Sequence, residues 1–500
     1  MAGASHFTIP AGSVRHALPY LRVAWVDYLV AGLYLAGIVV FGSYFARFQR
    51  TTGDYFLTDR SVPWWAICFT IVATETSTLT FIGVPAAAYA GNMAFLQLAA
   101  GYVLGRIIVS VLFLPAYFRG ALLTSYQLLQ QRFGASATTV AAGLFLVTRS
   151  LADGIRLFAT ALVISIVAGV PVGWTVVVLG TAMIVYTVRG GVAAVIWTDV
   201  VQMFIYLAGA IVVLSALLSQ IPGGFAEVLS AGAAADKFRV IDWSLDPTRV
   251  YTIWAGVAGG IALTLATHGT DQFLVQRLLS ARSSRDAARG LVLSGFLVFA
   301  QFVLFLFIGI MLFVYHQHVP LESALARTDE ILPRFILTNL PHGAIGFIVA
   351  AIVAAALSPS LNAMAATTVN DFYRKFVNPG ADEPTLMRVS RGATIVWGIV
   401  QLAVALGAQW MDRSVLEAGL AVLSLTTGPI LGAFVLAVAT RRVGAGAVLT
   451  GMIAGALVLG WIWWTAVVAW TWYALIGASV TCTVALLTSL ASRQPHGPDS

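Results

Sequence analysis

Long apolar runs alternate with short polar segments along almost the whole chain. An apolar run of about 20 residues forms a helix that can cross a hydrocarbon core roughly 30 Å thick. The pattern therefore predicts an all-α polytopic membrane protein with about 13 transmembrane helices. The expected spans cover residues 24–46, 63–89, 93–118, 136–168, 172–188, 191–220, 250–272, 287–316, 343–372, 387–409, 414–438, 443–464 and 468–491.

Composition narrows the class further. The 500 residues are 59% hydrophobic and 10% charged, whereas a soluble globular protein carries about 25% charged residues. The net charge of +7 is spread over short loops and does not indicate nucleic-acid binding. Cys68 and Cys482 lie in apolar runs and are expected to be packing residues rather than a disulfide. We expect a multi-pass protein of the cell membrane, whose partners are the lipid bilayer and a small-molecule substrate. The oligomeric state is left open.

The positive charges predict the orientation of the chain. Alternate loops concentrate arginine and lysine, among them Arg47, Arg119, Arg277 and Arg441, and most of the opposite loops contain few. Cytoplasmic loops carry the excess of positive charge in membrane proteins. We therefore expect the N-terminus outside and the C-terminus inside.

Two spans are interrupted by dense polar stretches, "ATETSTLTFIG" at residues 73–83 and "ATHGTDQF" at residues 266–273. Polar side chains compete for backbone hydrogen bonds, so both helices are expected to unwind there. For the second span, a continuous helix with its hydroxyls bonded to its own carbonyls is the alternative. Broken helices at matching points of two halves mark the central site of a transporter. Because the breaks lie five spans apart, we expect one domain over 1–500. Inverted repeats would cover 63–220 and 250–438, with peripheral segments at 24–62 and 443–491.

Charged residues inside spans are costly and therefore point to function. The fourth span places Arg149, Asp153 and Arg156 on one helix face. They form either a structural ion triad or a site in which an arginine holds an anionic substrate group. Arg106 in the third span is expected to pair with Glu75 or with a carbonyl.

The sixth, seventh and ninth spans carry other polar residues at depth. Asp199 could bind a cation or a proton, or it could be an ordinary carboxylate near a helix start. His268 is expected to be a hydrogen-bonded packing residue, because no second His or Cys stands at ligand spacing. Ser358 and Ser360 belong to a polar stripe in the ninth span, where Pro359 should kink the helix.

In combination, five motifs resemble the sodium:solute symporter family, which includes carriers of glucose, proline, iodide and sialic acid. They are "DYFLTDRSVPWWA", "ATETSTLTFIG", "GGVAAVIWTDVVQ", "TDQFLVQRLLSAR" and "SLNAMAATTVNDFYRK". The resemblance covers nearly the whole chain. It implies a LeuT-type fold with a 5+5 inverted repeat, and transport by alternating access.

The resemblance also implies roles for individual residues. Sodium-site carbonyls fall on Ala73 and Thr76, and Asp199 matches an acid that in some members joins a second sodium site. In sialic-acid-type members an arginine holds the substrate carboxylate, and Arg149 and Arg156 straddle that place. The implied substrate contacts are Ser77, Thr80, Gln97, Arg149, Arg156, Asp271, Gln272 and Phe273, the last three also as inner-gate contacts.

One pair of positions departs from the family pattern. The family has two hydroxyl side chains that complete the main sodium site, where this chain has Ala355 and Ala356. Hydroxyl oxygens suit a hard cation, and methyl groups cannot replace them. Ser358 and Ser360, together with Asp199, could form a shifted ion site.

We interpret the chain as a sodium:solute symporter for a small polar, anionic organic solute, with sodium as the coupling ion and no other cofactor. A proton-coupled or uncoupled carrier, with Asp199 or Glu75 titrating, is the alternative on the same fold. A membrane transceptor or sensor is the alternative from another class. We do not expect an enzyme, because no nucleophile–base pair or metal-ligand cluster appears within the spans.

Overall fold

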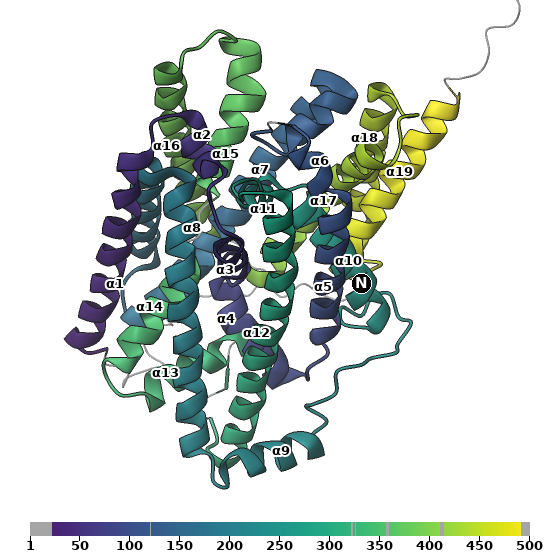
Figure 1. Ribbon diagram of the computed structural model, residues 1–500. Coiled ribbons are helices and arrows are strands. Elements are labelled where there is room, and N and C mark those ends of the chain that lie inside the picture. Colours follow the sequence, from purple (N-terminus) through teal and green to yellow (C-terminus); the bar gives the residue numbers. More distant parts are fainter. Residues whose placement is uncertain are drawn as a thin grey trace, which may run out of the picture.

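The computed structural model describes residues 23–120, 122–321, 324–325, 327–356, 360–410 and 415–491. Over these residues the chain is a bundle of helices, and its one β contact is a bridge between Val62 and Ala281 (Figure 1). The α-helices are α1 (Trp25–Tyr44), α2 (Thr52–Leu57), α3 (Trp64–Glu75), α4 (Thr78–Ala90), α5 (Leu96–Leu112), α6 (Leu114–Phe118), α7 (Tyr126–Ala168), α8 (Val172–Gln220), α9 (Gly224–Ala234), α10 (Ile253–Gly269), α11 (Gln272–Leu279), α12 (Ser284–His318), α13 (Ile331–Asn339), α14 (Ala344–Ala356), α15 (Leu361–Thr367), α16 (Glu383–Gly407), α17 (Val415–Ala439), α18 (Ala445–Thr465) and α19 (Tyr473–Ala491).

The predicted all-helical membrane architecture is confirmed. Among the described residues, 8 helices are long and apolar enough to cross a membrane, and the bent pair α3–α4 would make a ninth. Shorter apolar helices at Ile253–Gly269, Ala344–Ala354 and Thr426–Ala439 coincide with three more of the expected spans. The total of 13 crossings and the orientation of the termini stay predictions.

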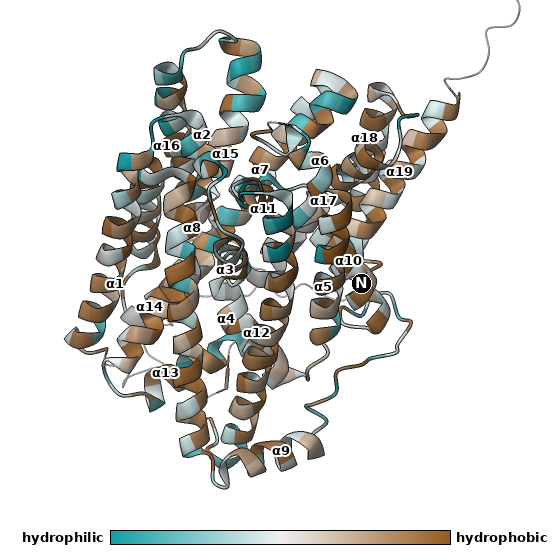
Figure 2. Ribbon diagram, viewed as in Figure 1, coloured by the Kyte–Doolittle hydropathy of each residue, from teal (hydrophilic) through white to brown (hydrophobic). Residues whose placement is uncertain are grey.

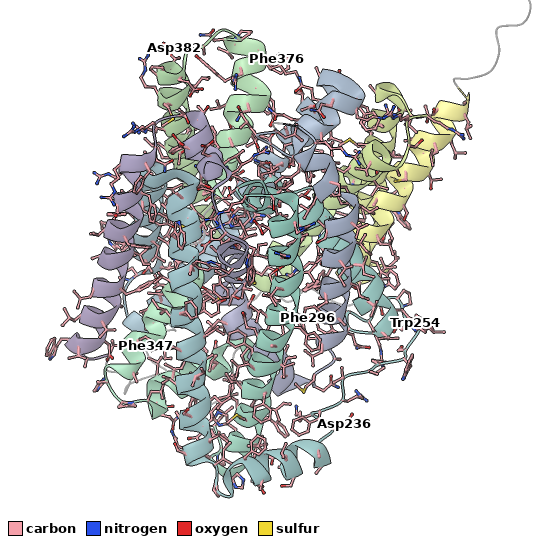
Figure 3. All side chains as sticks on the ribbon, viewed as in Figure 1. Asp236, Trp254, Phe296, Phe347, Phe376 and Asp382 are labelled. Carbon is pink, nitrogen blue, oxygen red and sulfur yellow. The ribbon has the colours of Figure 1, made fainter. Side chains whose placement is uncertain are left out.

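The surface of the bundle is apolar where lipid would cover it. Large side chains such as Leu33, Val40 and Leu457 are 63%, 70% and 70% exposed on the outer faces of α1 and α18. Figure 2 shows hydrophobic residues along the shafts of these helices. Asp382, just before α16, and Asp236, just after α9, lie at opposite ends of the bundle (Figure 3). The two loops therefore lie on opposite sides of the bundle.

Two helices near the centre of the bundle are broken, as the sequence predicts. The axis turns by 60° between Trp64–Glu75 and Thr80–Ala90. A second break separates α10 from α11. The broken helices pack closely against their neighbours: a Cβ on Gly105 of α5 would lie 2.6 Å from Thr264 of α10. Small residues let two membrane helices approach this closely.

The 49-residue helix α8 bends at Gly191, where two of the predicted spans meet. Gly191 has φ +57 and ψ −153, a backbone conformation that essentially only glycine adopts. A Cβ at this position would also lie 2.6 Å from the carbonyl oxygen of Tyr55. Gly134 in α7 has similar dihedral angles, φ +76 and ψ −166, but has no atom within 4 Å of a Cβ.

This pair of glycines gives a matched test. Gly191→Ala should lower the melting temperature of the purified protein more than Gly134→Ala, because both add strain of about 1–3 kcal/mol but only the first adds a clash. Thermal unfolding in detergent, followed by intrinsic fluorescence, measures the difference. Equal melting temperatures for the two variants would show that the contact with Tyr55 relaxes without cost.

Candidate functional site

A cavity of about 210 Å³ is lined by residues from both helix breaks and from α7. The helices that flank the breaks, among them α3, α4 and α11, lie in the middle of the bundle (Figure 1). One part of its wall is polar and charged, and another part is aromatic. The polar side chains are Thr74, Glu75, Ser77, Thr80, Arg149, Asp153, Arg156, Thr264, Thr267 and Asp271, and the aromatic ones are Phe95, Tyr102, Tyr251, Phe273, Phe302 and Trp470.

At the first break, α3 and α4 are separated by Thr76 and Ser77. The N–H of Ser77 donates to the carbonyl of Glu75 at 3.1 Å, whereas a continuous α-helix would use the carbonyl of Ala73. Ser77 and Thr80 cap the start of α4 reciprocally, and both line the cavity. The predicted unwinding of the second span is confirmed, and a continuous helix is excluded.

At the second break, α10 and α11 are separated by Thr270 and Asp271. One carboxylate oxygen of Asp271 accepts the N–H of Phe273 at 2.8 Å and so caps α11. The other accepts Nη1 of Arg149 at 3.0 Å. Asp271 and Phe273 line the cavity, where the sequence places them.

The two arginines of α7 differ in what they contact. Arg149 donates to Asp153 and to Asp271, each at 3.0 Å, and its guanidinium lies 4.0 Å from the ring centre of Phe273. Arg156 lies 3.8 Å from Asp153, beyond hydrogen-bonding distance, and its side chain is 21% exposed, against 5% for Arg149. Arg149 is therefore held by two carboxylates, while Arg156 keeps donors that can reach a ligand.

Glu75, which also lines the cavity, is the charged centre of a second cluster. Its Oε2 accepts Nη2 of the fully buried Arg106, as the sequence predicts. Its Oε1 lies 3.0 Å from Nε2 of His268, whose Nδ1 is 3.0 Å from the hydroxyl of Thr267. His268 is a packed, hydrogen-bonded residue, and over the described part of the chain no group of His, Cys, Asp and Glu could hold a metal ion.

Two predicted substrate residues lie away from the cavity. The amide of Gln97 donates to the carbonyl of Tyr251 at 3.2 Å and accepts the N–H of Asp242 at 3.1 Å. The amide oxygen of Gln272 accepts the N–H of Ser125 at 2.6 Å. Both side chains are buried, and backbone groups of adjoining loops use their hydrogen bonds. Here the structure differs from the prediction: these glutamines bind adjoining loops and do not line this cavity.

Asp199 is buried in a polar junction of three helices. Its Oδ2 accepts the hydroxyl of Thr70 at 2.5 Å and Nη2 of Arg277 at 3.1 Å. The Nε of Arg277 donates to the same hydroxyl at 3.1 Å. The charge pattern placed Arg277 in a cytoplasmic loop. In the structure it lies on α11 and is only 1% exposed. Its positive charge therefore compensates Asp199 and does not contribute to a cytoplasmic loop.

Thr76 at the first break is held from the far side by Gln301 of α12. Gln301 donates to the hydroxyl of Thr76 at 2.5 Å and accepts the hydroxyl of Tyr206 at 3.3 Å. Gln301 is not among the residues predicted from the sequence. A lone amide inside the apolar stretch "FLVFAQFVLF" was the signal that could have found it.

The remaining ion-site candidates are described only in part. Ser360 is buried, and its hydroxyl accepts the amide of Gln401 at 3.1 Å. Ser358 and the side chains of Ala355 and Ala356 lie outside the described residues. The shifted ion site therefore stays a prediction.

Comparisons with known proteins agree with this architecture. The model of the sodium:solute symporter family matches residues 55–455. The sodium/sialic acid symporter SiaT of Proteus mirabilis is 30% identical over 86% of this chain and 88% of its own length. The sodium/sialic acid symporter NanT of Aliivibrio fischeri is also 30% identical, over 93% of each chain. A solved structure of a Na+-coupled sialic acid symporter, substrate-bound and outward-open, superposes with a TM-score of 0.86. It is 27% identical and covers 94% of this chain and 98% of its own.

Proposed function

Because this chain belongs to the sodium:solute symporter family, we propose that it is a secondary carrier that moves a small organic anion together with sodium across the cell membrane. The observation that carries this proposal is Arg156, a partly exposed guanidinium on the wall of a central cavity between two broken helices. Relatives of known function are transporters, and the same class is proposed here.

Arg156 supplies the recognition of the anion. A guanidinium presents several N–H donors in one plane, which match the two oxygens of a carboxylate. Ser77 and Thr80 add hydroxyl groups to the lining of the same cavity, which suit a hydroxylated or amide-bearing solute. Sialic acid, the substrate in the names of two relatives, combines these features. It is therefore the first solute to test.

The sodium ion is assigned to the first break. Unwound backbone exposes carbonyl oxygens that can coordinate a hard cation. The carbonyls of Ala73 and Thr76 are the proposed ligands, with Ser358, Ser360 and Asp199 as further candidates. Since Ala355 and Ala356 stand where relatives of this family are expected to have hydroxyl groups, we expect weak sodium affinity.

Alternating access requires the cavity to open to one side of the membrane at a time. The cavity extends to Tyr251 and Trp470, which belong to the side predicted to be external. On the other side Gln276 donates to Asn362 at 2.7 Å, and Gln272 is bonded to the loop before α7. We propose that this arrangement is an outward-facing state, and that these inner hydrogen bonds break when the cavity opens to the cytoplasm.

Uptake into proteoliposomes tests the proposal. With purified full-length protein, an inward sodium gradient is expected to concentrate radiolabelled N-acetylneuraminate or a monocarboxylate such as lactate, while an equal potassium gradient is not. Glucose serves as the uncharged control and should not compete for uptake. Binding of neither acid, or uptake that ignores the sodium gradient, would refute the sodium-coupled anion carrier.

A further inference from the structure

His268 joins the two broken helices through a close contact with Glu75. It is the penultimate residue of α10, and Glu75 is the last residue of α3. Nε2 of His268 and Oε1 of Glu75 are 3.0 Å apart. The imidazole is buried, whereas Glu75 and Thr267 on either side of it line the cavity. A solute in the cavity therefore lies beside both neighbours of this ring.

The hydrogen bonds around His268 can be satisfied in two ways. Nε2 lies 3.0 Å from a carboxylate oxygen of Glu75 without hydrogen-bonding geometry, and the negative charge of the carboxylate favours a proton on that nitrogen. Nδ1 faces the hydroxyl of Thr267 at 3.0 Å, and the same hydroxyl lies 2.9 Å from the carbonyl of Leu263. A hydroxyl has one proton to give. If the proton points to Nδ1, the imidazole is neutral. If it points to Leu263, Nδ1 must itself carry a proton.

The two patterns differ by one proton and need no movement of heavy atoms. The charged groups that face His268 are Glu75 from α3, Arg106 from α5 and Asp271 at the second break. Glu75 and Arg106 cancel each other, and the arginines and carboxylates around Asp271 also cancel in pairs. With a neutral imidazole the wall has no net charge. A second proton on the ring makes it positive.

We propose that His268 is a proton-binding site of the carrier, filled when the anion enters and emptied when the anion leaves. This inference rests on the proposed transport of an anion. An anion is costly to bury in a site without net charge, and a proton on His268 would add a positive charge beside the anion in addition to the proposed sodium ion. The sequence offered Asp199 and Glu75 as titrating groups. The geometry points instead to the imidazole between Glu75 and Thr267.

Nitrogen-15 NMR of histidine-labelled, full-length protein in liposomes tests the site without any solute. The signal of His268, identified by its loss in H268Q, is expected to change from singly to doubly protonated as the pH is lowered below neutral. E75Q should weaken proton binding by about tenfold or more, since the carboxylate favours the charged ring. A His268 signal that keeps one form over this range, or that is unchanged in E75Q, overturns the proposal.

His318 and Glu227 provide the matched control, because they form a similar pair, 3.4 Å apart, near the surface. E227Q should leave the His268 titration unchanged. In sodium-free liposomes, an inward proton gradient should speed uptake of the acid probes by wild type and E227Q but not by H268Q. An equal response in H268Q contradicts the coupling role. Since the NMR titration needs no substrate, it separates failure of this site from failure of anion transport.

Discussion

Replacing Arg156 with glutamine is expected to raise the KM for the transported acid by about ten- to a hundredfold, with little change in protein yield. The side chain contributes charge-assisted hydrogen bonds, typically worth about 1.5–3 kcal/mol each. It lies beyond hydrogen-bonding distance of Asp153, so its loss disturbs the fold little. Concentration-dependent uptake in proteoliposomes measures the effect, and Arg156→Lys should recover part of the affinity.

Arg149 is the control for this experiment. Arg149→Gln leaves Asp153 and Asp271 without their shared cation, so it should reduce folded protein as well as transport. If R156Q transports with an unchanged KM while R149Q alone loses substrate affinity in folded protein, the two roles assigned here are reversed.

Asp199→Asn is expected to destabilise the protein by about 3–5 kcal/mol, because it leaves the buried guanidinium of Arg277 without its counter-charge. The melting temperature in detergent should fall clearly. The double variant D199L/R277M removes both charges together and should recover most of the loss, since an apolar pair can replace a buried ion pair. A wild-type melting temperature for D199N would show that Arg277 finds another acceptor.

The same double variant tests the assignment of Asp199 to an ion site. If the folded D199L/R277M protein transports with an unchanged dependence on sodium, Asp199 is not a ligand of the coupling ion. If the dependence disappears while the protein still binds its solute, the carboxylate belongs to the ion pathway as well as to the fold.

The sequence located the breaks because a break has a local cause. Residues 73–83 combine hydroxyl groups and a carboxylate in an apolar span, and each of these side chains competes with the helical hydrogen bonds of its own backbone. The pairing of Glu75 with Arg106 was likewise predictable, since a charge inside a membrane span needs an opposite charge nearby. The residue that completes the cluster, His268, could be expected to be hydrogen-bonded, but its partner could not be identified.

Which polar side chains face the cavity was beyond the sequence. Gln97 and Gln272 are as polar as Ser77, yet they bond to loops that come from distant parts of the chain. In the sequence, Arg277 is one of several arginines that follow an apolar span. Only the packing of α11 inside the bundle brings its side chain into contact with Asp199.

By itself, the sequence determined the membrane class, the helical architecture, the two breaks and the charged face of α7, because these depend on hydropathy and on neighbours within a few residues. Only the tertiary structure decided that Arg149 is held by two carboxylates while Arg156 is not, and that His268 lies between Glu75 and Thr267. The physical reason is that the availability of a donor depends on every acceptor within about 3 Å of it. In this bundle those acceptors come from helices far apart in the sequence.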